Sequence, residues 1–89
     1  MAHVVFTANL RRHVDCPEVD VDGGTVREVL ERLFAERPAI RGYVLDDQGA
    51  LRKHMAVFVD GERIRDRTHL AVAVRPESRI HVVQALSGG

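Results

Sequence analysis

Residues 25–36 read Thr-Val-Arg-Glu-Val-Leu-Glu-Arg-Leu-Phe-Ala-Glu, and they carry the strongest structural signal in the chain. Thr25 and Glu28 have the spacing of a capping box, in which each side chain binds a backbone N–H at the start of a helix. Pro38 marks the point by which that helix ends. The apolar residues recur at i, i+3, i+4, i+7 and i+8, which predicts an amphipathic helix with one buried face formed by Val26, Val29, Leu30, Leu33 and Phe34.

The segments that precede this helix alternate in the manner of β-strands. Residues 3–9 are predicted to form a first strand, and one of its faces carries Val4, Phe6 and Ala8. Residues 13–21 are predicted to form a second strand. Because Pro17 cannot donate a ladder hydrogen bond, we place that strand at a sheet edge.

Short strands and turns are predicted to follow the helix. The apolar run at residues 43–45 is interpreted as a short strand, whereas the run at residues 70–74 is ambiguous. Residues 55–59 and 62–65 form a hairpin around Asp60-Gly61, a pair suited to positive φ. Residues 79–85 form the last strand, so the element order predicts an α+β fold with one main helix across one face of a small mixed sheet. We expect a single domain over residues 1–89, with residues 86–89 as a flexible C-terminal tail.

Composition narrows the classes of function. The chain has 89 residues, of which 45% are hydrophobic and 29% charged, and its 13 basic residues balance 13 acidic ones. This balance removes the electrostatic case for binding nucleic acid or a membrane surface. No apolar run approaches the roughly 18 residues of a membrane span and no signal-peptide pattern opens the chain, so we expect a cytoplasmic protein. So small a chain has little room for a full catalytic apparatus, and we expect a protein that acts with partner enzymes.

Few side chains in the sequence stand in patterns that indicate a catalytic or metal-binding role. The five histidines are never paired at i, i+2 or i, i+4, so we predict no metal site. The single cysteine, Cys16, excludes an internal disulfide and is interpreted as a small buried residue. Ser87 has no accompanying His/Asp pattern that would activate a serine nucleophile, so it is interpreted as a spacer residue before the two glycines. The alternating Arg63, Arg65 and Arg67 are interpreted as a solvated face, with a docking patch for an acidic enzyme surface as the alternative.

Three stretches together resemble the MoaD/ThiS family of ubiquitin-like β-grasp sulfur carriers. They are residues 4–11 (VVFTANLR), residues 58–62 (FVDGE) and residues 80–89 (IHVVQALSGG), with Gly88-Gly89 as the most specific element. Two places depart from the family pattern. Residues 76–79 replace its acidic turn, and Thr7 stands where the molybdopterin-pathway members tend to place an aromatic residue.

The resemblance implies a chemistry for the carboxyl terminus. A partner adenylyltransferase of the ubiquitin-activating type would use Mg-ATP to adenylate Gly89, and sulfur from a donor would convert it to a thiocarboxylate for a sulfur-accepting enzyme. Gly88, Ser87 and Leu86 would thread into the narrow active-site channel, where residues without a Cβ clear the walls. No tightly bound cofactor is implied. The recipient pathway, whether molybdopterin, cysteine, thiamin or another metabolite, stays open.

Alternation also predicts a partner-binding sheet face, on the side away from the helix. Its residues would be Val5, Thr7, His81, Val83 and Ala85, although the two valines are equally compatible with an ordinary surface. Two other functions remain open. The same tail would serve a protein modifier that is joined to lysines, and self-conjugation would then use Lys53, the only lysine, or the N-terminus. The other open function is a β-grasp interaction module in which the Gly-Gly pair is incidental.

Overall fold

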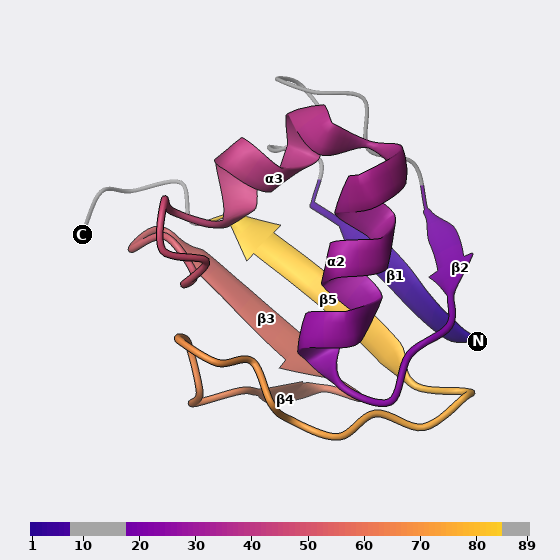
Figure 1. Cartoon of the computed structure of the whole chain (residues 1–89). Coiled ribbons are helices and arrows are strands. Elements are labelled where there is room, and N and C mark those ends of the chain that lie inside the picture. The colour runs from indigo at the N-terminus through magenta and orange to yellow at the C-terminus, as the bar shows by residue number, and fades with distance from the viewer. Residues whose placement is uncertain (8–17, 85–89) are drawn as a thin grey trace.

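Five strands form one mixed sheet in the computed structural model, which describes residues 1–7 and 18–84 (Figure 1). The strand order is β2-β1-β5-β3-β4. The parallel pair β1–β5 lies at its centre, and every other pair is antiparallel. The strands are β1 (Ala2–Phe6), β2 (Val19–Val21), β3 (Met55–Val59), β4 (Glu62–Arg63) and β5 (Arg79–Gln84).

Helix α2 (Val26–Glu36) crosses one face of this sheet, in front of β1 and β5 in Figure 1. The backbone N–H of Glu28 donates to Thr25 Oγ1 at 3.2 Å, and Gly24 N–H donates to Glu28 Oε1 at 2.8 Å. The predicted capping box is therefore confirmed, although Glu28 binds the residue before the cap. All five residues of the predicted apolar stripe are buried.

A second helix, α3 (Pro38–Val44), occupies the segment that we interpreted as ending in a short strand. The prediction of a strand at residues 43–45 is wrong. Pro38 stands in the first turn, where a missing N–H costs nothing, and Ile40 and Val44 lie one turn apart and pack into the core. Tyr43 is 41% exposed. Leu45 alone pairs with another segment, through an isolated bridge to Leu51.

The core lies between the helices and one face of the sheet. Side chains of a strand point alternately to its two faces, and β1 and β5 bury every second residue. Val4 and Phe6 are buried as predicted, and they face inward together with Met55, Val57, Ile80 and Val82. The predicted fold class, with one main helix across a small mixed sheet, is confirmed.

The strands are shorter than the sequence pattern predicted. β1 ends at Phe6 and β4 at Arg63, and the ambiguous run at residues 70–74 contributes only a bridge from Ala73 to Thr25. β2 keeps three residues at the sheet edge, the position predicted from Pro17. Residues 8–17, including Ala8, Cys16 and Pro17 itself, lie outside the described residues. Within the described ranges, none of the helices has the length and apolarity needed to cross a membrane.

The predicted Asp60-Gly61 turn is confirmed, and its Asp60 side chain also binds the start of β5. Both residues have positive φ, at 51° and 89°. The Asp60 carboxylate accepts hydrogen bonds from Arg79 N–H and from the Ser78 hydroxyl, each at 2.9 Å. These bonds, that of Arg79 first, lower the pKa of Asp60. The turn of the hairpin therefore fixes the residue at which β5 begins.

We predict that Thr25→Ala lowers the free energy of unfolding by about 1 kcal/mol, because the first turn of α2 loses its side-chain cap. Urea denaturation measures this change. Thr68→Ala, which removes the hydroxyl of an exposed threonine, is the matched control. Equal losses in the two variants would contradict the assignment of Thr25 as the cap.

Candidate functional site

The face of the sheet away from the helices gathers three of the predicted partner-binding residues. Val5 and His81 are register partners across the parallel β1–β5 pair, and Val83 follows His81 on the same face. All three are partly exposed, whereas their strand neighbours Ile80 and Val82 are buried. The structure therefore brings Val5, His81 and Val83 together as alternation predicted.

Strand β3 adds two residues that the sequence analysis missed. Ala56 pairs with Val83 and Phe58 pairs with His81 across the antiparallel β3–β5 ladder, so both lie on this same face. Alternation within residues 55–59 already separates them from the buried Met55 and Val57. That signal is weak without the register, because only strand pairing shows which residues stand beside His81 and Val83.

The two margins of this face carry different charged groups. On the β3–β4 side, Lys53, His54 and Arg63 line a depression of about 320 Å³, together with Met55, Ala56, Phe58 and Val83. On the β2 side, Glu18 and Asp20 are paired with His3, and the exposed Arg79 is the register partner of His3 in β5. An exposed apolar centre bordered by charged side chains is typical of a protein-binding surface.

The side chain of His3, a residue of β1, binds both of these carboxylates. Its Nδ1 lies 2.9 Å from Asp20 Oδ1 and its Nε2 lies 2.8 Å from Glu18 Oε1. These two hydrogen bonds, that to Asp20 first, raise the pKa of His3 above its ordinary value. The two carboxylates thus favour the protonated imidazolium, which donates from both nitrogens.

Thr7 holds the end of β5 from the neighbouring strand. Its Oγ1 accepts a hydrogen bond from the backbone N–H of Gln84 at 3.3 Å, and its own N–H donates to the carbonyl of Val82 at 3.2 Å. The structure thereby gives Thr7 a supporting contact within the protein. Gln84 is the last residue of β5, so Thr7 helps to fix the point from which residues 85–89 continue.

The remaining predicted site residues lie outside the described part of the chain. They are Ala85, Leu86, Ser87, Gly88 and Gly89. Their roles in partner binding, threading and adenylation stay predictions. Among residues 1–7 and 18–84, no group of three or more His, Cys, Asp or Glu side chains is arranged to hold a metal ion.

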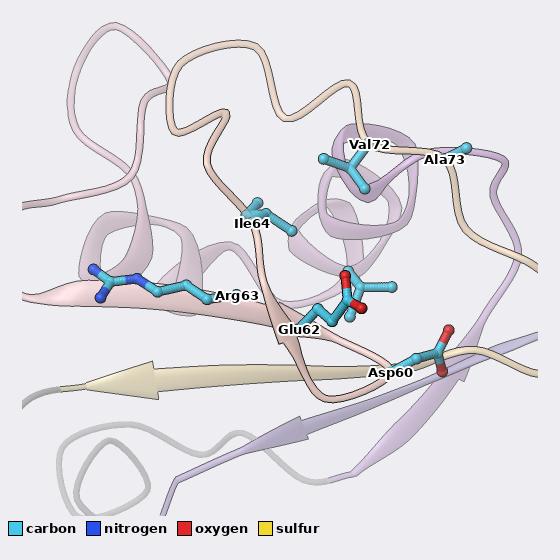
Figure 2. A pocket seen from close by; sticks show the side chains of 7 residues that line it. Asp60, Glu62, Arg63, Ile64, Val72 and Ala73 are labelled. Atoms are coloured by element: carbon cyan, nitrogen blue, oxygen red, sulfur yellow. The ribbon is translucent and has the colours of Figure 1, made fainter.

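A second pocket, of about 370 Å³, lies between the β3–β4 hairpin and residues 72–73 (Figure 2). Asp60, one of its carboxylates, is already bound to Ser78 and Arg79. Figure 2 shows the guanidinium of Arg63 extending away from Val72 and Ala73. The charged groups around this pocket therefore do not converge on a common point, and we place the candidate site on the open sheet face.

The mixed sheet, the crossing helix and the central β5 define a ubiquitin-like β-grasp protein. The family model of the ThiS family matches residues 4–89, and the chain belongs to that family. Members of this class are small ubiquitin-like carriers or modifiers rather than enzymes. No curated protein matches the chain by sequence.

Solved structures agree with this assignment. A chain of the Amycolatopsis orientalis BexX/CysO complex superposes with a TM-score of 0.83 at 22% identity, with 100% of each chain covered. Mycobacterium tuberculosis CysO gives a TM-score of 0.80 at 24% identity, covering 97% of this chain and 100% of its own. SAMP1 from Haloferax volcanii gives a TM-score of 0.77 at 28% identity, with 99% and 98% covered. At these identities the two CysO structures establish the fold alone.

The raised pKa of His3 predicts a pH-dependent contribution to stability. Because the folded state binds this proton more tightly, the contribution is fully present below the unfolded pKa of about 6.5 and is lost as the pH rises through the folded value. The stability advantage of the wild type over His3→Gln should therefore be larger at about pH 5 than at about pH 8.5. Urea denaturation at both pH values measures it.

His54→Gln, which removes an exposed histidine, is the matched control and should retain the pH dependence of the wild type. A difference between wild type and His3→Gln that stays constant or grows with pH would contradict the proposed contacts of His3.

Proposed function

We propose that this chain is a sulfur carrier whose Gly89 carboxylate is adenylated and then converted to a thiocarboxylate. The observation that carries the proposal is the pair Gly88-Gly89, which stands four and five residues beyond the last residue of β5 in a ThiS-family β-grasp domain. Glycine without a Cβ suits a tail that enters a narrow channel.

The chemistry begins with an ionised α-carboxyl group, the form present at neutral pH. A carboxylate oxygen of Gly89 attacks the α-phosphorus of Mg-ATP, and pyrophosphate leaves. Sulfide then attacks the carbonyl carbon of the acyl-adenylate, the bond from that carbon to the bridging oxygen breaks, and AMP departs. The product is a thiocarboxylate, whose nucleophilic sulfur forms a bond to the acceptor's substrate; hydrolysis of the acyl–sulfur bond then leaves the sulfur on that substrate and returns the Gly89 carboxylate.

These steps require an adenylyltransferase of the ubiquitin-activating type, a sulfur donor and a sulfur-accepting enzyme. The carrier contributes a surface that partners recognise and a tail that begins at a defined position, the end of β5. Its last strand is bound by β1 on one side and by β3 on the other, and Asp60 and Thr7 bind its two ends. A partner that grips the sheet therefore also fixes the place from which the tail starts.

We propose the open sheet face as the surface that such a partner grips. It comprises the predicted Val5, Thr7, His81, Val83 and Ala85, to which the ladder adds Ala56 and Phe58. Support comes from the partial exposure of Val5, Ala56, Phe58 and Val83 between margins that carry charged side chains. One of the similar structures, that of the BexX/CysO complex, contains a β-grasp protein bound to another protein.

A protein modifier is the second candidate, and the likeness to SAMP1 supports it. A related structure, 26% identical over 99% of this chain, is that of the small archaeal modifier protein 1 from Methanosarcina acetivorans. The modifier uses the same activated Gly89 but transfers its acyl group to a lysine. Immunoblots of tagged protein under denaturing conditions separate the two, since a ladder of conjugates supports the modifier and free protein alone supports the carrier.

Gly89→Val is expected to lower carrier-dependent ATP–pyrophosphate exchange by the cognate adenylyltransferase at least tenfold, because the side chain obstructs the channel. Gly42→Val is the matched control. Apart from its chain neighbours and the backbone of α3, a Cβ at Gly42 meets no atom within 4 Å, so exchange should stay at the wild-type level. Equal exchange with both variants would contradict the assignment of Gly89 as the reacting residue.

Val83→Glu is expected to raise the KM for the carrier in the same assay about tenfold or more, because it places a charge in the apolar centre of the proposed interface. Ala35→Glu makes the same change in net charge on the exposed side of α2 and should leave KM unaltered. If both variants behave alike, the partner binds elsewhere.

A further inference from the structure

We propose that the depression at the β3–β4 margin of the open sheet face, here called the basic depression, receives an acidic side chain of the partner adenylyltransferase together with an apolar side chain beside it. The basic residues Lys53, His54 and Arg63 line the depression, and Phe58 and Val83 contribute to its apolar floor. The inference rests on the proposed function and deepens it, because it names the chemistry that the partner presents to this surface.

The basic side chains of the depression have no acidic partner among the described residues. None of the described lining residues is acidic, and within residues 1–7 and 18–84 Lys53, His54 and Arg63 form no ion pair. Glu62, the neighbour of Arg63 in β4, lines the pocket beside residues 72–73 and not this depression. Figure 2 shows the Glu62 carboxylate and the Arg63 guanidinium extending in different directions from the strand. The depression therefore favours an anionic group supplied by another molecule.

Strand pairing brings the charged and the apolar groups of the depression together. Arg63 is the register partner of Phe58 across the β3–β4 ladder, and the Cβ atoms of such partners stand about 5 Å apart. Val83 lies on the same face, on the other side of β3. Lys53 precedes β3 and lines the end of the depression at which that strand begins. A carboxylate placed near Arg63 and Lys53 therefore has an apolar surface next to it.

The structure groups Arg63 differently from the sequence pattern, in which it alternates with Arg65 and Arg67. The guanidinium of Arg67 donates to the carbonyl of Arg52 at 2.6 Å, so it is bound within the protein. Arg65 is exposed and does not line the depression. The basic cluster therefore combines one residue of β4 with residues that precede β3, and the alternating arginines do not act as one docking patch.

The apolar floor determines how strongly the depression holds a carboxylate. An ion pair on an open surface contributes little, because water screens both charges. A partner whose apolar side chain covers Phe58 and Val83 excludes that water, and its carboxylate then interacts more strongly with Lys53 and Arg63. A small free anion covers no part of the floor and stays screened. We therefore expect the depression to select an acidic side chain with an apolar neighbour, presented by a protein.

Acetylation of amines reports on the occupancy of the depression, because Lys53 is the only lysine of the chain. The carrier is treated with a small acetylating reagent, alone and with the adenylyltransferase, and the rate at Lys53 is followed by peptide mapping. With enough enzyme to bind about nine-tenths of the carrier, we expect this rate to fall about tenfold, because only the free fraction reacts. The α-amine of Met1 is the internal control. Figure 1 shows the N-terminus at the opposite end of the sheet from the beginning of β3, so its rate should be unchanged.

Reversal of one charge tests the acidic character of the partner. Arg63→Glu sets a like charge against the incoming carboxylate, so the KM for the carrier in pyrophosphate exchange should rise about tenfold or more at an unchanged maximal rate. Arg63→Lys keeps the charge and should stay close to the wild type. Arg32→Glu makes the same change in net charge on the exposed side of α2 and should leave KM unaltered. Added sodium chloride should raise KM less for Arg63→Gln than for the wild type.

Unchanged acetylation of Lys53 in the enzyme complex, equal protection of Lys53 and Met1, or equal KM values for Arg63→Glu and Arg32→Glu would overturn the proposal. These outcomes are obtained with an enzyme that performs exchange with the wild-type carrier, so they leave the adenylation of Gly89 standing. Absence of exchange with the wild type would instead contradict the proposed function, and the docking role of the basic depression with it.

Discussion

The central position of β5 is the constraint on which the rest of the structure depends. This strand is hydrogen-bonded to β1 and β3 and buries Ile80 and Val82 against the helices. Its beginning is fixed by the Asp60 carboxylate and its end by the Thr7 hydroxyl. Because a central strand cannot shift without breaking two ladders and inverting its buried face, the tail always begins at the same point relative to the open sheet face.

The parts of the fold that follow from local rules were predictable from the sequence. The capping box, the apolar stripe of α2 and the Asp60-Gly61 turn each depend on neighbouring residues. Helix α3 was missed because its core contacts, through Ile40 and Val44, are tertiary and its short sequence has no cap signal. The role of Arg27 also could not be predicted from the local sequence. Its side chain leaves the helix surface to bind the carbonyls of Gly49 and Thr68, which are distant in sequence.

The residues of the candidate site also separate into those that local sequence predicted and those that required the structure. Alternation within β1 and β5 was enough to predict Val5, His81 and Val83, because a period of two is a local property. Ala56 and Phe58 required the β3–β5 register. The Gly88-Gly89 signal, by contrast, is chemical and comes from the sequence. The structure therefore supplies the sheet surface and the fixed position at which the tail begins. The sequence supplies the terminus that is proposed to react.

The central claim, a thiocarboxylate at Gly89, is tested most directly by mass spectrometry of the C-terminal tryptic peptide that starts at Ile80. The carrier is incubated with its adenylyltransferase, Mg-ATP and sulfide, and then treated with a thiocarboxylate-selective alkylating reagent. The account predicts ATP-dependent alkylation at Gly89. An unmodified carboxylate at Gly89, in the presence of an enzyme that performs carrier-dependent pyrophosphate exchange, would contradict it.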